Sequence, residues 1–233
     1  MIDVTDPGLS FYVDKLRARQ PFSLARYGDG EWSVIVRDRQ TCVGQRLDLP
    51  GMRDAMIQSI RRAPRDPAYL LACHPNQSRG NIEDWLKENQ PAWLKWLDNR
   101  TLYYASMHGK LFPFVDALRN LSAPLVVIGP AHLRKLSSIL PVAGFIEIPP
   151  TDAWHSFAVI LEACEAWRGV PTCFSISAGP TSSPLVWRLF ARGFGDGWLL
   201  DVGSLWDIYC GVWSRGYHSR ITPEIRRRNL EGA

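Results

Sequence analysis

The amino-acid sequence predicts an α/β fold in which helices cover both faces of a mainly parallel sheet. Short, continuous apolar runs such as 124–129 are typical of strands that are buried on both faces. Amphipathic segments with helical spacing alternate with these runs along most of the chain. A hydrophobic content of 46% with 21% charged residues is that of a folded globular protein, and 233 residues suffice for one α/β domain.

In the first half of the chain, apolar spacing and turn residues locate the expected elements. Asp6 and Pro7 predict the start of a helix over 7–19, because proline is favoured in the first turn of a helix. An apolar run over 22–25 predicts a buried strand. The further expected helices begin near 31, cover 52–62, 81–98 with an interruption at Pro91, and 111–118, and the further expected strands cover 68–73 and 101–106.

In the second half, strands are followed by short polar loops. Thr151 or Asp152 is expected to cap a helix that runs to about Trp167, and Gly193 to close a helix over 184–192. The remaining expected elements are strands over 124–129, 144–148, 172–177 and 198–200 and a helix over 131–139. We expect one domain over 1–233, with an N-terminal helix within 1–19 and a C-terminal tail over 216–233.

Composition restricts the classes of function. A net charge of +4 suits a protein that handles anionic ligands such as nucleotides, without requiring nucleic acid, and the ten tryptophans suit either a core or stacking on sugars and bases. We expect the arginine run at 226–228 to be a solvated part of the tail. The five scattered cysteines are expected to be reduced core residues. With no signal peptide and no membrane span in the sequence, we expect a cytoplasmic protein.

The segment 22–32 is the main candidate for a functional site. An apolar strand leads into Arg26, and two glycines then bracket Asp29 before Glu31. The two carboxylates suit a divalent cation such as Mg²⁺ or Mn²⁺, and such a cation suits a diphosphate, to which Arg26 can add a bidentate contact. The alternative is a plain turn, in which Asp29 caps backbone amides and Glu31 is an ordinary first-turn charge.

Other polar residues also follow predicted strands, where ligands bind in parallel sheets. The backbone amides of 177–181 begin a helix and suit a phosphate, or form a plain turn. Asp201 can hold a sugar hydroxyl, act as a base, or cap a loop. His74 and His108 can contact a substrate, or can be ordinary loop or core histidines.

Several familiar motifs are missing from the sequence. It contains no phosphate-binding loop of the G-x-x-x-x-G-K-[ST] type, no G-x-G-x-x-G after a strand, no H-E-x-x-H and no G-x-S-x-G. These absences disfavour ATPases, ordinary dehydrogenases, zinc proteases and serine hydrolases. A methyltransferase stays open, because the glycine loop of that class varies.

Residues 26–31, RYGDGE, resemble the R-[FY]-G-D-G-E signature of the GT-D type glycosyltransferases, which contains a D-x-E motif. The segment 179–181, GPT, before a helix is similar to a G-P-T segment of that family. The run 200–204, LDVGS, with Asp207 and Tyr209, resembles its D-[IV]-G element. The similarity covers roughly residues 20 to 215, with the motifs in the expected order, and the first motif is the most specific.

The resemblance implies a Rossmann-like domain that transfers a sugar from a nucleotide-sugar donor, usually a UDP-sugar, with the help of Mn²⁺ or Mg²⁺. It implies that Asp29 and Glu31 are ligands of the metal. The residues expected at the donor are Arg26, Gly28, Gly30, Gly179, Pro180, Thr181 and Gly203, and the candidates for the catalytic base are Asp201, His74 and His108. The sequence departs from some members of the family at 106–109, at 129–130 and at Ser204, which leaves the donor sugar and the acceptor open.

The leading hypothesis is therefore a metal-dependent glycosyltransferase. Its acceptor is a glycan, a glycoprotein or a nucleic acid, and the sequence leaves a homo-oligomer open. Two rivals remain: a nucleotide or nucleic-acid binding module that uses basic and aromatic surface, and a methyltransferase-like Rossmann enzyme.

Overall fold

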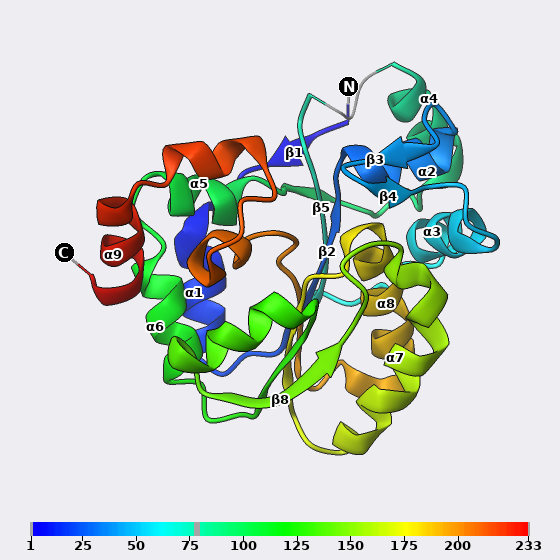
Figure 1. The fold of residues 1–233 in the computed structure, drawn as a ribbon. Helices are drawn as coiled ribbons and strands as arrows, with labels where there is room; N and C mark the ends of the chain where they lie inside the picture. The colour runs from blue at the N-terminus through cyan, green and yellow to red at the C-terminus, as the bar shows by residue number, and fades with distance from the viewer. Residues whose placement is uncertain (1, 77–79, 233) are drawn as a thin grey trace.

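Within residues 2–76 and 80–232, which the computed structural model describes, eight strands form one sheet in which all neighbours run parallel (Figure 1). From edge to edge they are β1 (Val4–Thr5), β6 (Trp96–Asp98), β5 (Tyr69–Cys73), β2 (Phe22–Tyr27), β10 (Trp198–Asp201), β9 (Cys173–Ile176), β7 (Leu125–Gly129) and β8 (Val142–Glu147). The α/β fold and its parallel sheet are confirmed. Since all strands point the same way, their carboxyl ends meet at one edge, where ligands bind in this class of fold.

Helices pack on both faces of the sheet (Figure 1). One face carries α1 (Gly8–Arg17), α5 (Thr101–Met107), α6 (Phe112–Arg119) and α9 (Pro223–Glu231), and the other carries α2 (Asp29–Val36), α3 (Met52–Arg61), α4 (Asn81–Asn89), α7 (Phe157–Cys164) and α8 (Ser182–Leu189). Successive strand residues serve opposite faces. On β2, Phe22 and Leu24 join the core beneath the first set, and Ala25 and Tyr27 join the core beneath the second.

Three aromatic rings fix helix α2 against the sheet. Trp32 on α2 packs on Tyr27 of β2 and on Trp96 of β6, with ring centroids 5.5 and 5.7 Å apart, and all three side chains are buried. Packed aromatic pairs of this kind stabilise a core beyond the area they bury. The start of α2, which carries Asp29 and Glu31, is therefore held at the end of β2.

Two elements differ in type from the sequence prediction. The tryptophan spacing predicted a helix up to residue 98, but Trp96–Asp98 form β6, because the run after Pro91 is short and pairs with β5, with Trp96 beside Leu71. Residues 101–106 were expected to form a strand because of their aromatic content. They form helix α5, whose buried residues Leu102, Ala105 and Ser106 have helical spacing.

Short segments around the sheet complete the path of the chain. A hairpin of β3 (Thr41–Cys42) and β4 (Gln45–Arg46), not expected from the sequence, follows α2. Asp152 stands at the N-cap of the helical turn that begins at Ala153, as expected, but its backbone is left-handed (φ 54°) and its carboxylate accepts the Arg46 amide, 2.7 Å away, instead of an amide of that turn. The remaining helical turns are η1 (Ala131–Ser138), η2 (Ala153–Ser156), η3 (Glu165–Trp167), η4 (Gly179–Thr181), η5 (Phe190–Phe194), η6 (Asp207–Cys210) and η7 (Gly216–Arg220).

The predicted C-terminal tail contains a packed helix. Buried Asn229 on α9 accepts a hydrogen bond from the amide of Leu111 at 2.9 Å and donates to the carbonyl of Ser106 at 2.7 Å. It also donates to the hydroxyl of Tyr209 at 2.8 Å. The arginine run 226–228 therefore lies on an ordered helix, which is anchored to α5, α6 and η6.

Candidate active site

A small cavity of about 110 Å³ lies at the carboxyl ends of β2 and β10, the two central strands of the sheet. It brings together most of the residues singled out from the sequence, which come from segments almost 180 residues apart. The predicted residues on its wall are Arg26, Gly28, Asp29, Gly30, Glu31, Gly179, Pro180, Asp201 and Gly203. Thr181 lies just below this wall and is buried.

The two carboxylates of the D-x-E motif stand on the first turn of α2. Oε2 of Glu31 accepts a hydrogen bond from the backbone amide of Gly28 at 2.8 Å, so Glu31 also caps its own helix. Burial, and next the charge of nearby Asp201, raise the pKa of the Glu31 carboxyl from 4.5 to about 7. A cation in the cavity would offset this repulsion between carboxylates.

Asp29 has an unexpected neighbour. The thiol of Cys42, on the β3–β4 hairpin, donates a hydrogen bond to Oδ2 of Asp29 at 3.4 Å. Cys42 was expected to be a core cysteine, but it is only partly buried and lines the cavity, whereas the other four cysteines are buried. Burial and the adjacent Asp29 raise the pKa of this thiol to about 11, which keeps it protonated and a donor.

Asp201 joins the ends of β2 and β10. Its Oδ2 accepts the backbone amide of Arg26 and its Oδ1 accepts the amide of Gly203, each at 3.1 Å. The residue is 3% exposed. Burial raises the pKa of Asp201 from 3.8 to about 6, opposed by the charge of Arg26 and by these hydrogen bonds. As the catalytic base Asp201 stays a prediction, and the geometry gives it a structural task.

The Arg26 side chain crosses the same junction. Its Nη1 donates to the carbonyl of Val202 at 3.3 Å, and the backbone carbonyl of Arg26 accepts the hydroxyl of Ser183 at 2.6 Å. Within the part of the chain that the structure describes, its buried Nε has no hydrogen-bond partner. The guanidinium is thus held by the protein while it keeps donor capacity beside the cavity.

Two glycines stand where a Cβ atom would make a close contact. Gly203 has a φ of +53°, and a Cβ atom there would lie 2.7 Å from Nη2 of Arg26. A Cβ atom on Gly30 would lie 3.2 Å from Cγ of Pro180, where α2 approaches the loop after β9. These glycines let the loops after three strands come together around the cavity.

The cavity continues into a wider one of about 360 Å³, and the two share Val43, Gln45, Gly179, Gly203, Ser204 and Arg215. The wider part reaches His132 after β7 and Asp207 on η6. Sequence reasoning missed Arg215, Gln45 and His132. Nothing in the local sequence marks Arg215, and His132 follows the β7 strand by three residues, which is the signal that could have found it.

The two histidines proposed from the sequence lie elsewhere. Nδ1 of His74, after β5, accepts the amide of Asn76 at 3.0 Å, and burial lowers the pKa of this histidine. His108 is exposed at the end of helix α5 and packs against the ring of Tyr104. Neither lines the cavity around Asp29 and Glu31. His108 was expected to follow a strand, but the segment before it is helix α5.

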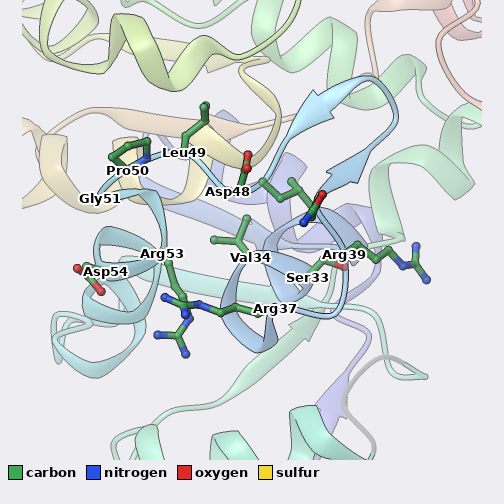
Figure 2. A pocket seen from close by; sticks show the side chains of 12 residues that line it. Ser33, Val34, Arg37, Arg39, Asp48, Leu49, Pro50, Gly51, Arg53 and Asp54 are labelled. Atoms are coloured by element: carbon green, nitrogen blue, oxygen red, sulfur yellow. The ribbon is translucent and has the colours of Figure 1, made fainter.

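Figure 2 shows a separate pocket of about 380 Å³ between α2, α3 and the segment before α3. It contains the basic side chains Arg37, Arg39 and Arg53, and Nε of Arg53 donates to the carbonyl of Ile35 at the end of α2. None of the residues predicted for the site lies on its wall. The pocket is at the opposite end of α2 from Asp29 and Glu31.

The part of the chain that the structure describes contains neither a membrane-spanning helix nor a cluster of three or more metal-binding side chains. No helix in this part of the chain is long and apolar enough to cross a membrane. No group of three or more histidine, cysteine, aspartate or glutamate side chains among these residues is arranged to hold a metal ion.

No protein-family model matches the sequence, and no curated protein matches it significantly. Solved structures do share its fold. One is described as showing that the highly conserved domain of unknown function 1792 has a distinct glycosyltransferase fold; it has a TM-score of 0.63 and 16% identity and covers 88% of this chain and 80% of its own. Another, a new glycosyltransferase of the same domain type from Streptococcus sanguinis, has a TM-score of 0.62 and 16% identity, with 89% and 84% covered. The chain has this glycosyltransferase fold, as the resemblance of residues 26–31 predicted.

Proposed function

We propose that the protein is a glycosyltransferase that moves a sugar from a nucleotide-sugar donor, a UDP-sugar, to an acceptor hydroxyl. The observation that carries the proposal is the cavity at the ends of β2 and β10, where Asp29, Glu31 and Asp201 meet Arg26 and Arg215. Carboxylates beside guanidinium groups suit a diphosphate that is bound together with a cation. The glycosyltransferase fold supports the same assignment.

The cavity residues fit Mn²⁺ or Mg²⁺ in one specific way. Mg²⁺ is commonly bound by one or two carboxylates together with substrate phosphates, rather than by a cage of protein side chains. Asp29 and Glu31 supply two such carboxylates, and a bound cation would offset the effect of burial and of nearby Asp201, which raise the pKa of Glu31. When bound, the metal would neutralise charge on the departing nucleoside diphosphate.

Side chains would bind the diphosphate, and glycines in the backbone would leave room for the rest of the donor. Arg26 is held by the protein, and Arg215 lines both parts of the cavity, so the two guanidinium groups can contact the diphosphate from different sides. Gly28, Gly30, Gly179 and Gly203 leave room for the donor beside the backbone. The wider part of the cavity, which reaches His132 and Asp207, can take the sugar and the acceptor.

The setting of the reaction belongs to the proposal as well. Four of the five cysteines are buried, and none forms a disulfide, which agrees with a reducing compartment such as the cytoplasm. The acceptor is a glycan, a glycoprotein or a nucleic acid, and a homo-oligomer stays a prediction that light scattering can check.

A thermal-shift panel followed by a donor screen tests the proposal. UDP, UDP-sugars, S-adenosylmethionine and single-stranded DNA would each be added with and without Mn²⁺. We expect UDP and one or more UDP-sugars to stabilise the protein only with Mn²⁺, and the stabilising UDP-sugar to release UDP when an acceptor is present. Stabilisation by S-adenosylmethionine alone would show a methyltransferase instead, and DNA binding that weakens steeply with salt would show a binding module.

A further inference from the structure

A histidine and an aspartate are paired in the wider part of the cavity. Nε2 of His132, on η1, lies 2.9 Å from Oδ1 of Asp207, on η6. The other oxygen of Asp207 accepts a hydrogen bond from the hydroxyl of Ser214. The Asp207 carboxylate is therefore engaged on both oxygens, and it holds the imidazole from one side.

This pairing determines which ring nitrogen is free. An ionised carboxylate only accepts hydrogen bonds, so Nε2 of His132 carries the proton that it shares with Asp207, and Nδ1 keeps its lone pair. Among the described residues no group donates a hydrogen bond to Nδ1. The His132 side chain is 24% exposed, whereas that of Asp207 is 11% exposed. Asp207 thus orients the imidazole, and the ring is partly exposed in the cavity.

The position of the pair connects it to the candidate active site. His132 shares a cavity wall with Gly179, Gly203 and Arg215, and these three residues also line the cavity that contains Asp29 and Glu31. A donor whose diphosphate lies beside Asp29 would extend its sugar along this shared wall. An acceptor entering through the wider part would then meet the imidazole of His132.

We propose that His132 is the catalytic base that accepts the proton of the acceptor hydroxyl, and that Asp207 is the positioning residue that orients it. The inference rests on the proposed function and deepens it. In the step, Nδ1 takes the hydroxyl proton while the acceptor oxygen forms a bond to the anomeric carbon. The bond from that carbon to the diphosphate oxygen breaks, and its electron pair leaves with the nucleoside diphosphate. The imidazolium then returns the proton to solvent. This direct displacement inverts the anomeric centre.

Asp201 is less suited to this task. Both of its side-chain oxygens accept hydrogen bonds from backbone amides and the residue is 3% exposed, so an acceptor hydroxyl has poor access to it. A base needs to reach the proton it removes within hydrogen-bond distance. His132 meets this requirement without rearrangement of the strand ends.

Other charged and titratable groups lie near His132 and Asp207, and they can also affect how kcat depends on pH. Glu147, on β8, shares a cavity wall with His132 and is ion-paired with Arg134 of η1. The others are Lys135, whose Nζ donates to the carbonyl of Cys210, Arg215 on the cavity wall, and buried His218, which accepts the amide of Ser214. A titration assigned to His132 must therefore disappear when His132 alone is replaced.

Steady-state kinetics with the stabilising UDP-sugar would test the step. His132→Gln keeps an amide that can donate to Asp207 but cannot accept a proton. We expect kcat to fall by about 10²- to 10⁴-fold, with the affinity for UDP and Mn²⁺ unchanged. The rise of kcat with pH in the wild type should vanish in the variant. Imidazole in the buffer should partly restore His132→Gly. His155→Gln, at an exposed histidine outside these cavities, is the matched control and should behave as wild type.

Retention of kcat within about threefold in His132→Gln, with the same pH profile, would overturn the assignment. So would a loss of the pH-dependent rise in Asp201→Asn with His132→Gln unaffected. A second measurement needs no turnover. In ¹⁵N-histidine NMR of the wild type at high pH, His132 should be the Nε2–H tautomer, and Asp207→Asn should change this. An Nδ1–H tautomer in the wild type would contradict the role of His132, whatever the outcome of the donor screen. Failure of every UDP-sugar as a donor would instead count against the proposed function.

Discussion

The backbone amide of Arg26 donates a hydrogen bond to Oδ2 of Asp201 at 3.1 Å, and so links the ends of two adjacent strands that are 175 residues apart in sequence. Gly203, two residues after Asp201, leaves the space that the guanidinium of Arg26 occupies. The motif around Arg26 and the motif around Asp201 thus form one site, and a substitution in one motif should affect the other.

Replacing Gly203 should disturb Arg26. A Cβ atom would lie 2.7 Å from Nη2, so Gly203→Ala should displace the guanidinium and weaken UDP binding by about tenfold or more. Gly169→Ala is the matched control, because Gly169 also has a positive φ, of +77°, but nothing lies within 4 Å of a Cβ atom there. Both variants should lose about 1 kcal/mol of stability through backbone strain. Equal UDP affinities by calorimetry would contradict the coupling.

A variant of Arg215 can show whether the nucleotide binds in the candidate active site, which Arg215 lines, or in the basic pocket of Figure 2, which it does not line. If the nucleotide binds at the strand ends, Arg215→Ala should weaken UDP binding by about tenfold, because a charge-assisted contact to phosphate is lost. Arg37→Ala, in the other pocket, should leave the affinity unchanged. If titration of both variants with UDP shows that Arg37→Ala weakens binding and Arg215→Ala does not, the nucleotide binds in the basic pocket and the proposed site is wrong.

The raised pKa of Glu31 makes the metal-free protein sensitive to pH. Because folding raises this pKa from 4.5 to about 7, the folded state favours the protonated carboxyl. Its contribution to stability is complete below pH 4.5 and is lost as the pH rises through 7. Glu31→Gln should therefore match wild type at pH 4.5 and be more stable by about 1–3 kcal/mol at pH 8 in chelator. Glu162→Gln, at an exposed glutamate on α7, should show no such difference. Denaturant unfolding at both pH values would reveal the opposite sign if Glu31 were stabilised as an anion.

Asn229 tests whether the C-terminal helix belongs to the fold. Asn229→Ala removes three hydrogen bonds and leaves the buried amide of Leu111 without its partner, which should cost about 2–4 kcal/mol in denaturant unfolding. Arg227→Ala, two residues earlier and exposed, should change stability by less than about 0.5 kcal/mol. Similar unfolding midpoints for the two variants would mean that α9 is dispensable.

Where the sequence prediction succeeded, the local pattern and the tertiary structure agree. The buried strands β2, β5, β7 and β9 are mostly apolar, and strand ends in a parallel sheet converge, so Asp29, Gly179 and Asp201 could be expected to meet. Where tertiary packing overrides local preference, the prediction failed. Trp96 forms a strand because β5 pairs with it, and residues 101–107 form a helix despite their aromatic content.

The site residues that were not predicted from the sequence were missed for a common reason. Arg215 lies in a segment with no motif, and His132 is marked only by its place three residues after β7, yet both line one cavity in the folded chain. The pairing of His132 with Asp207 spans 75 residues. No periodicity or spacing in the sequence encodes such a contact.

Calorimetric titration of UDP shows whether Asp29 and Glu31 bind a cation together with a diphosphate. With Mn²⁺ the wild type should bind UDP at least about tenfold more tightly than in chelator, and Asp29→Asn, which keeps the shape of the side chain, should abolish that difference. If the wild type binds UDP equally well in chelator, or if Asp29→Asn keeps the full Mn²⁺ effect, the two carboxylates do not hold the metal and the account of the site is contradicted.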